Sequence, residues 1–295
     1  MGRKFFSRKR IVLLTILLIL AGLLAAALDC RLVVRRYGLD AAEISAPVRI
    51  VLVTDLHSCY YGEGQKTLIE AVDAQMPDLI LLGGDIFDDK LDDANTEQFL
   101  AGIAGKYPCY YVTGNHEYWS GAKNFAAKMA ILEKYGVTIL SGLCETIEVN
   151  GETINLCGVD DPDAYMLSDI IAPPGYAYAE DESVSTFEQQ LDTVKQQSDN
   201  GNFTILLSHR PELFESYAER GFDLVLCGHA HGGQWRIPWL LNGLYAPNQG
   251  MFPPYAGGRY EENGVTMIVS RGLARESTIV PRIFNRPELV VVEIK

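Results

Sequence analysis

The chain has 295 residues, of which 48% are hydrophobic, and this is enough apolar material for one large core. The formal net charge is −13, from 25 basic and 38 acidic residues. An acidic surface repels polyanions, so the composition argues against nucleic acid as a partner. Any phosphate chemistry must therefore take its positive charge from a local source, such as bound metal ions.

The N-terminal segment predicts a transmembrane helix over Ile11–Leu28, which contains no charged residue. At about 1.5 Å per residue this helix is roughly 27 Å long, close to the thickness of a bilayer core. More basic residues precede the apolar segment than follow it: Arg3, Lys4, Arg8, Lys9 and Arg10 against Arg31, Arg35 and Arg36. This excess predicts that residues 1–10 form a basic cytoplasmic tail and that the remaining chain lies outside the cytoplasm.

Two other interpretations of the N-terminal segment stay open. A signal peptide cleaved near Ala25-Ala26-Ala27 is one, although signal h-regions are usually only about 7–15 residues long. Cys30 suits a lipoprotein, except that Asp29 stands where a small residue is expected. We therefore favour an uncleaved anchor in the cell membrane.

Residues 29–47 are predicted to form a linker or a leading strand, and residues 48–295 a single domain. Apolar runs in this domain end in polar turns, which is typical of strands buried on both faces. The predicted strands are Arg49–Thr54, Asp78–Gly83, Cys109–Thr113, Phe203–Leu207, Leu224–Cys227, Val265–Ser270 and Leu289–Ile294. Helical patterns fall between several of them, at Thr67–Met76, Asn95–Gly105, Asn124–Tyr135, Phe187–Gln197 and Glu212–Arg220. This alternation predicts an α/β fold with crossover connections.

A β-hairpin is predicted where Thr146–Val149 and Glu152–Leu156 flank the turn Asn150-Gly151. Counting outward from a two-residue turn places Cys144 opposite Cys157, at a site where Cα atoms approach within disulfide range. We expect a cross-strand disulfide here if the domain lies outside the cytoplasm. Cys109 and Cys227 sit within apolar strands and are expected to be core residues.

All five histidines of the sequence lie just beyond the C-terminal end of a predicted strand, where open α/β sheets place their binding crevice. Four polar blocks carry them, and a fifth block of the same kind carries carboxylates only: Asp55-Leu56-His57, Gly84-Asp85-Ile86-Phe87-Asp88, Gly114-Asn115-His116-Glu117, Ser208-His209-Arg210-Pro211 and Gly228-His229-Ala230-His231. Residues i and i+2 of an extended segment point the same way, so Asp55 and His57 are expected to hold one ion together.

These five blocks, in this order, resemble the calcineurin-like metallophosphoesterase superfamily. The pattern of that family is D-x-H, G-D-x-x-D, G-N-H-E or G-N-H-D, an isolated His, and G-H-x-H. The resemblance covers residues 49–231, and its continuation through Gly232–Trp235 and Ser270–Gly272 is similar to the membrane-associated bacterial phosphodiesterase branch. It implies a catalytic domain over residues 48–295, folded as a β-sandwich of mixed sheets flanked by helices in four layers, αββα.

The resemblance also implies a centre of two divalent metal ions. The implied ligands are Asp55, His57 and His231 for one ion, Asn115, His209 and His229 for the other, and Asp85 as the bridge between them. His116 would face the substrate as a general acid or a stabiliser of the transition state. Two adjacent ions activate water and neutralise charge on a phosphate. Nitrogen and oxygen ligands without thiolate suit Mn²⁺, Fe or Zn²⁺ better than Mg²⁺.

One departure from the family pattern is Asp89, because many members carry a substrate-binding Arg at this position. Arg210 and Arg271 are the candidates for contacting phosphate instead, and a plain surface charge is the alternative for each. Asp88 is expected to orient a neighbouring group.

Two further features stay open. The acidic turn Gly158–Asp163 either supports the metal site from behind, binds a cation, or is a solvated loop. The apolar loops Trp235–Leu241 and Met251–Tyr255 either accept a lipid or touch the bilayer, or they form a layer packed on the sheet.

The sequence thus predicts a metal-dependent hydrolase that cleaves a phosphodiester or pyrophosphate bond, in a lipid-linked or cell-envelope substrate. A phosphomonoesterase and a metal-binding scaffold without turnover are the alternatives.

Overall fold

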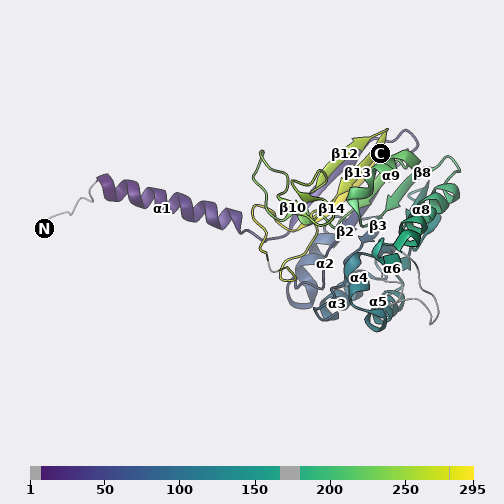
Figure 1. The fold of residues 1–295 in the computed structure, drawn as a ribbon, viewed down its shortest axis with the longest axis horizontal. Coiled ribbons are helices and arrows are strands. Elements are labelled where there is room, and N and C mark those ends of the chain that lie inside the picture. Colours follow the sequence, from purple (N-terminus) through teal and green to yellow (C-terminus); the bar gives the residue numbers. More distant parts are fainter. Residues whose placement is uncertain (1–7, 167–179, 279) are drawn as a thin grey trace.

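The computed structural model describes residues 8–166, 180–278 and 280–295. Within these residues, two six-stranded sheets face each other at the centre of the domain (Figure 1). The first sheet has the order β1 (Val33–Leu39), β14 (Glu288–Ile294), β2 (Val48–Val53), β3 (Leu79–Gly83), β4 (Cys109–Val112) and β5 (Thr138–Ile139). The second has the order β12 (Gly258–Glu262), β13 (Val265–Val269), β9 (Leu224–Cys227), β8 (Phe203–Leu207), β7 (Glu152–Gly158) and β6 (Leu143–Val149).

Both sheets are mixed. In the first, β2, β3, β4 and β5 run parallel, whereas β14 is antiparallel to β2 and parallel to β1. In the second, β7, β8, β9 and β13 run parallel, and the outer strands β6 and β12 are antiparallel to their neighbours. A separate two-stranded ribbon pairs β10 (Tyr245–Ala246) with β11 (Gly250–Met251).

The strand sequences alternate between two apolar cores. Along β2, Ile50 and Leu52 join the core between the sheets, where they meet Ile205 and other residues of the second sheet. Val51 and Val53 point the other way, into a core shared with the helices on the outer face. This period of two is the geometry of an extended chain, and it explains why the central strands are apolar at every position.

Helices cover the outer face of each sheet. The first sheet is covered by α2 (Lys66–Asp73), α3 (Ala94–Ile103) and α5 (Ala122–Lys134), and the second by α8 (Glu180–Gln197) and α9 (Phe214–Arg220). The shorter helices α4 (Asn115–Trp119) and α6 (Asp163–Met166) lie near the strand ends. The predicted four-layer αββα arrangement of mixed sheets is confirmed.

The N-terminal helix α1 (Arg8–Ala27) projects away from the domain as a single rod (Figure 1). It is the one helix of the described chain that is long and apolar enough to cross a membrane, with a mean hydropathy of 2.5. After it, the segment left open as a linker or leading strand contains β1, whose seven residues pair with β14. Two adjacent arginines, Arg35 and Arg36, lie on this strand, which is tolerated because β1 is at the edge of its sheet.

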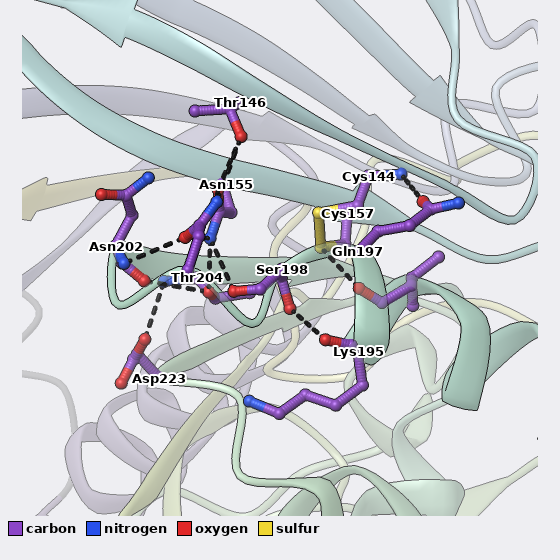
Figure 2. Close-up of a disulfide and its surroundings, with 12 residues drawn as sticks. Cys144, Thr146, Asn155, Cys157, Lys195, Gln197, Ser198, Asn202, Thr204 and Asp223 are labelled. Atoms are coloured by element: carbon purple, nitrogen blue, oxygen red, sulfur yellow. Dashed lines mark hydrogen bonds between the residues drawn. A yellow bond between two sulfur atoms is a disulfide. The ribbon is translucent and has the colours of Figure 1, made fainter.

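The predicted hairpin is present, and β6 and β7 pair in the expected register with Cys144 opposite Cys157. These two cysteines form a disulfide, with 3.9 Å between their Cα atoms. Figure 2 shows the end of α8 held against the same hairpin, where Gln197 accepts a hydrogen bond from the Cys144 N–H and Asn155 donates to the Ser198 carbonyl. Cys109 and Cys227 are buried thiols of the core, as expected.

Candidate metal centre

The five polar blocks meet where the parallel strands of both sheets end. Asp55 and His57 follow β2, Asp85 follows β3, and Asn115 follows β4 in the first sheet. The remaining two blocks follow β8 and β9 in the second sheet. Because both sheets present the carboxyl ends of these strands to one crevice, residues far apart in the chain become neighbours.

Several residues of the centre have left-handed backbone conformations, which are uncommon outside glycine. They are Asp55, His57, Asp85, His229 and His231, with φ values between 46° and 64°. Hydrogen bonds between loops hold this backbone, since the Asp55 N–H donates to Gly84 and the His57 N–H donates to Asp85. Backbone of this kind clusters at functional sites, where surrounding contacts keep it in place.

The first group of candidate ligands is Asp55, His57, Asp85 and His231, whose ligand atoms all lie within 4.8 Å of one another. The Nε2 atom of His57 is 3.3 Å from Nε2 of His231 and 3.5 Å from Oδ2 of Asp85. The Nε2 atom of His231 is 3.4 Å from Oδ1 of Asp55. These atoms point at one common position.

The second group is Asp85, His209 and His229. Nε2 of His209 lies 3.2 Å from Oδ2 of Asp85 and 3.2 Å from Nδ1 of His229. Asp85 therefore belongs to both groups, which is the position that a bridging carboxylate needs. Asn115 is buried beside it, between Gly114 and His116, and the His116 N–H donates to Oδ1 of Asp85.

Two oxygen atoms of the centre are buried without any hydrogen-bond partner: Oδ2 of Asp55 and Oδ1 of Asn115. A buried polar oxygen without a partner is costly, and a bound ion is one way to satisfy it. Both atoms belong to residues expected to bind metal, one for each ion. The donor set is nitrogen and oxygen only, so the residues present fit divalent cations.

Hydrogen bonds behind the imidazoles set which nitrogen faces the centre. His57 Nδ1 is 3.1 Å from Oδ2 of Asp88, and His209 Nδ1 donates to the Gly83 carbonyl at 2.8 Å. His229 Nε2 donates to Oδ1 of Asn248 at 2.9 Å. Each contact leaves the other ring nitrogen directed inward, which is how partners behind metal-binding histidines act. Asn248 was not found by sequence reasoning, because its loop carries no motif.

Glu117 joins two of the strand-end loops. Its fully buried carboxylate accepts hydrogen bonds from four backbone N–H groups, those of Asp85, Ile86, Phe87 and Gly114, at 2.8–3.1 Å. Burial, together with the charge of Asp85, raises the pKa of Glu117 to about 7. Glu117, the last residue of the G-N-H-E block, thus holds the loop of Asp85 in place through these hydrogen bonds.

His116 lies at the rim of the centre, where its side chain remains partly exposed. Its Nδ1 atom is 2.7 Å from Oδ1 of Asp89 and 3.6 Å from Oδ2 of Asp88. Burial opposes protonation, but the charge of Asp85 and the bonds to Asp88 and Asp89 outweigh it and raise the pKa of His116 to about 9. Asp89, the residue that departs from the family pattern, thus forms a hydrogen bond with His116.

The two arginines predicted to contact phosphate are both paired with carboxylates. Arg210 is buried and donates to both oxygens of Asp161, at 2.5 and 2.7 Å, and to Asp163 at 3.0 Å. Arg271 donates to Glu288 at 2.6 Å. Their contact with a substrate stays a prediction.

The acidic turn is not a solvated loop, because Asp161 is fully buried. Arg210 links this carboxylate to the centre, since it also donates to Asn248 at 2.7 Å, the residue behind His229. The turn therefore supports the metal site from behind, which is one of the alternatives that the sequence left open.

The fold and these clusters are of the kind found in metal-dependent hydrolases. A family model described as calcineurin-like phosphoesterase matches residues 48–233, and the chain belongs to this family, as the sequence blocks predicted. Homologues in the family are named metallophosphoesterase and phosphodiesterase, and the family is hydrolytic.

Curated relatives agree with this assignment, and one solved structure shares the fold. The chain is 30% identical over 235 residues to an uncharacterized metallophosphoesterase of Helicobacter pylori, an alignment that covers 78% of this chain but only 55% of the relative. It is 28% identical to phosphodiesterase YaeI of Escherichia coli, over 85% of this chain and 83% of that protein. The structure of Haemophilus influenzae NAD nucleotidase has a similar fold, with a TM-score of 0.51, 18% identity, and coverage of 78% of this chain and 46% of that chain.

Proposed function

We propose that the chain hydrolyses a phosphodiester or pyrophosphate bond with two divalent metal ions. One ion is held by Asp55, His57 and His231, the other by Asn115, His209 and His229, with Asp85 shared. The observation that carries this proposal is the position of Asp85, whose Oδ2 atom is 3.5 Å from His57 Nε2 and 3.2 Å from His209 Nε2. One carboxylate oxygen thus lies between imidazoles of both groups.

The ions, when bound, supply an activated water and positive charge for the phosphate oxygens. The side chains of the protein position the ions and supply the proton for the leaving group. Asp85 and Glu117 fix the loop geometry of the centre, and the buried carboxylates attract cations into a crevice that excludes bulk water. His116, at the rim and protonated beside Asp89, donates its proton from Nε2 to the leaving oxygen.

A diester is favoured over a monoester by the likeness to YaeI, which is named a phosphodiesterase. The lipid-linked or cell-envelope substrate is supported by α1, which is long enough to hold the domain at a membrane. A phosphomonoesterase remains the second candidate, because a bridged pair of ions can bind either class of phosphate.

The catalytic domain is proposed to lie outside the cytoplasm, with α1 as a single-pass anchor. The disulfide between Cys144 and Cys157 supports this placement, since disulfides persist in oxidising compartments and are rare in the cytosol. The excess of basic residues before α1 agrees with it.

The test compares bis-p-nitrophenyl phosphate with p-nitrophenyl phosphate as substrates of the full chain, loaded with Mn²⁺, Fe²⁺ or Zn²⁺ and again after chelation. The proposal expects faster turnover of the diester and loss of both activities with chelator. Faster turnover of the monoester supports the second candidate. Absence of turnover with every metal supports a scaffold without catalysis.

A further inference from the structure

A short segment, residues 281–287, holds the end of α1 to the domain. The Phe284 N–H donates to the carbonyl of Ala27, the last residue of α1, at 2.7 Å. Arg286 forms an ion pair with Asp29 at 3.4 Å and donates to the carbonyl of Arg31. If α1 spans a bilayer, the surface around this segment lies at the membrane interface.

An apolar hairpin, residues 237–241, stands next to that segment, and we call it the apolar tip. Ile237 and Leu241 exchange backbone hydrogen bonds at 3.1 and 2.9 Å, so the residues between them form a tight turn. Trp239 occupies a left-handed position in this turn, with φ of 64°, and its side chain is fully exposed. Leu240 beside it is 80% exposed.

The residues that lead into the apolar tip are hydrogen-bonded to the segment that holds α1. The Trp235 indole donates to the Pro281 carbonyl at 3.0 Å, and the Arg236 N–H donates to the Ile283 carbonyl at 2.9 Å. In Figure 1, α1 projects from the side of the domain that carries β10 and its neighbouring loops. Exposed tryptophan and leucine at this place match the composition of a membrane interface.

A positively charged cavity of about 500 Å³ opens beneath the apolar tip, and we call it the arginine pocket. It is lined by Arg35, Arg236 and Arg271, together with Phe284 and the tip itself. Within the described residues, the ion pairs of these guanidiniums all go to one carboxylate, that of Glu288. Three cations against one anion leave excess positive charge, in a protein whose net charge is −13.

Arg236 is the least compensated of the three. Its guanidinium donates to the Gly232 carbonyl at 3.4 Å and to the Asn242 side chain, and no carboxylate of the described chain lies within ion-pairing distance. Burial, and then the nearby charge of Arg271, lowers the pKa of Arg236 to about 10. An anion placed in the pocket would remove this repulsion between like charges.

We propose that the apolar tip enters the leaflet from which α1 emerges and that the arginine pocket binds the phosphate of an anionic phospholipid. Guanidinium groups bind phosphate through paired hydrogen bonds, and the tip would contact the acyl chains above the headgroup. The inference rests on the membrane placement of α1 proposed above. The pocket is separate from the metal ligands but adjoins them, because a Cβ on Gly232, the residue after His231, would lie 2.9 Å from Cγ of Arg271.

The insertion of the tip is tested with the full chain in lipid nanodiscs that contain bromine-labelled acyl chains, which quench nearby tryptophan. We expect strong quenching that Trp239→Phe largely removes, with Trp119→Phe as the matched control that leaves it unchanged. Equal quenching in wild-type protein and Trp239→Phe would overturn the insertion of the tip. Extraction of the protein by alkaline carbonate tests α1 separately, so a failed anchor is distinguished from a failed tip.

Headgroup binding is tested by native mass spectrometry of the detergent-solubilised full chain, with phosphatidylglycerol and phosphatidylcholine as competing probes. Arg236→Gln is expected to lower the preference for phosphatidylglycerol about fivefold. Arg35→Gln should act in the same direction, and because this side chain is half exposed the variant keeps its fold. Arg259→Gln is the control that should change nothing, because Arg259 is exposed, is paired with Glu261, and does not line the pocket.

Chelation separates this site from the metal centre. The preference for phosphatidylglycerol should survive removal of the metals, because the arginines alone supply the charge. A preference that disappears with chelator, or one that both arginine variants leave unchanged, would contradict the proposal. Either result would place the lipid phosphate at the metals or at no specific site.

Discussion

Replacement of Asp161 by Asn tests the buried support behind the metal centre. Asp161 is fully buried, and its two oxygens accept hydrogen bonds from the equally buried guanidinium of Arg210. Removing one partner of such a pair leaves an uncompensated charge in the interior and costs about 3–5 kcal/mol. Asp163 and Glu212 lie 3.0 and 3.6 Å from the same guanidinium. Because they still compensate part of its charge, we expect a loss of stability toward the lower end of that range.

The assay is urea unfolding of the full chain in detergent, with thermal unfolding beside it. For a domain of this size, a loss of about 3–5 kcal/mol corresponds to a Tm lower by roughly 6–20 °C. Asp163→Asn is the matched control, because Asp163 is partly exposed and accepts only one bond from this guanidinium, so the loss of stability should stay near 1 kcal/mol or below.

A double replacement distinguishes the cost of an unpaired buried charge from the contribution of the Asp161–Arg210 ion pair itself. Asp161→Leu combined with Arg210→Met removes both charges and should recover much of the stability lost in Asp161→Asn. The reasoning is refuted if Asp161→Asn unfolds no more easily than Asp163→Asn.

Three other predictions concern the centre and the disulfide. Asp85→Ala should lose both metals, whereas His116→Ala should keep both by elemental analysis and lose rate by about 10²–10⁴-fold; metal loss in the second variant would disprove its role. Gly84→Ala should displace His209, because a Cβ there would lie 2.5 Å from its Nδ1 at a φ of 85°, and a normal metal content would contradict this. Cys144→Ala should destabilise the oxidised protein by about 3 kcal/mol, and reduction should destabilise the wild type by a similar amount in urea unfolding; equal midpoints for oxidised and reduced wild type would argue against the disulfide.

The central strands could be predicted from sequence because they are apolar on both faces. β8 and β9 begin and end at the predicted residues, and β2, β3, β4 and β13 differ from the prediction only at their ends. Of the edge strands, β1 was left open between a linker and a strand and β12 was not predicted, since both carry charged side chains that face solvent. Their pairing depends on a neighbour distant in sequence, which no local pattern reveals.

The candidate ligands could be named because each stands in a recognisable block at a strand end. The groups that orient them could not, because they depend on the approach of separate loops. Asn248 reaches His229 from a loop without a motif, and no local pattern signals the pairing of Arg210 with Asp161. Glu117 stands in a motif, yet its four bonds to other loops follow only from the folded chain.

The metal content of the purified protein tests the central claim most directly. The full chain, stripped with chelator and then loaded in turn with Mn²⁺, Fe²⁺ and Zn²⁺, is measured by elemental analysis after removal of free metal. The geometry around Asp85 predicts about two equivalents per chain with at least one of these metals. Fewer than two equivalents with every metal would contradict a shared two-ion centre.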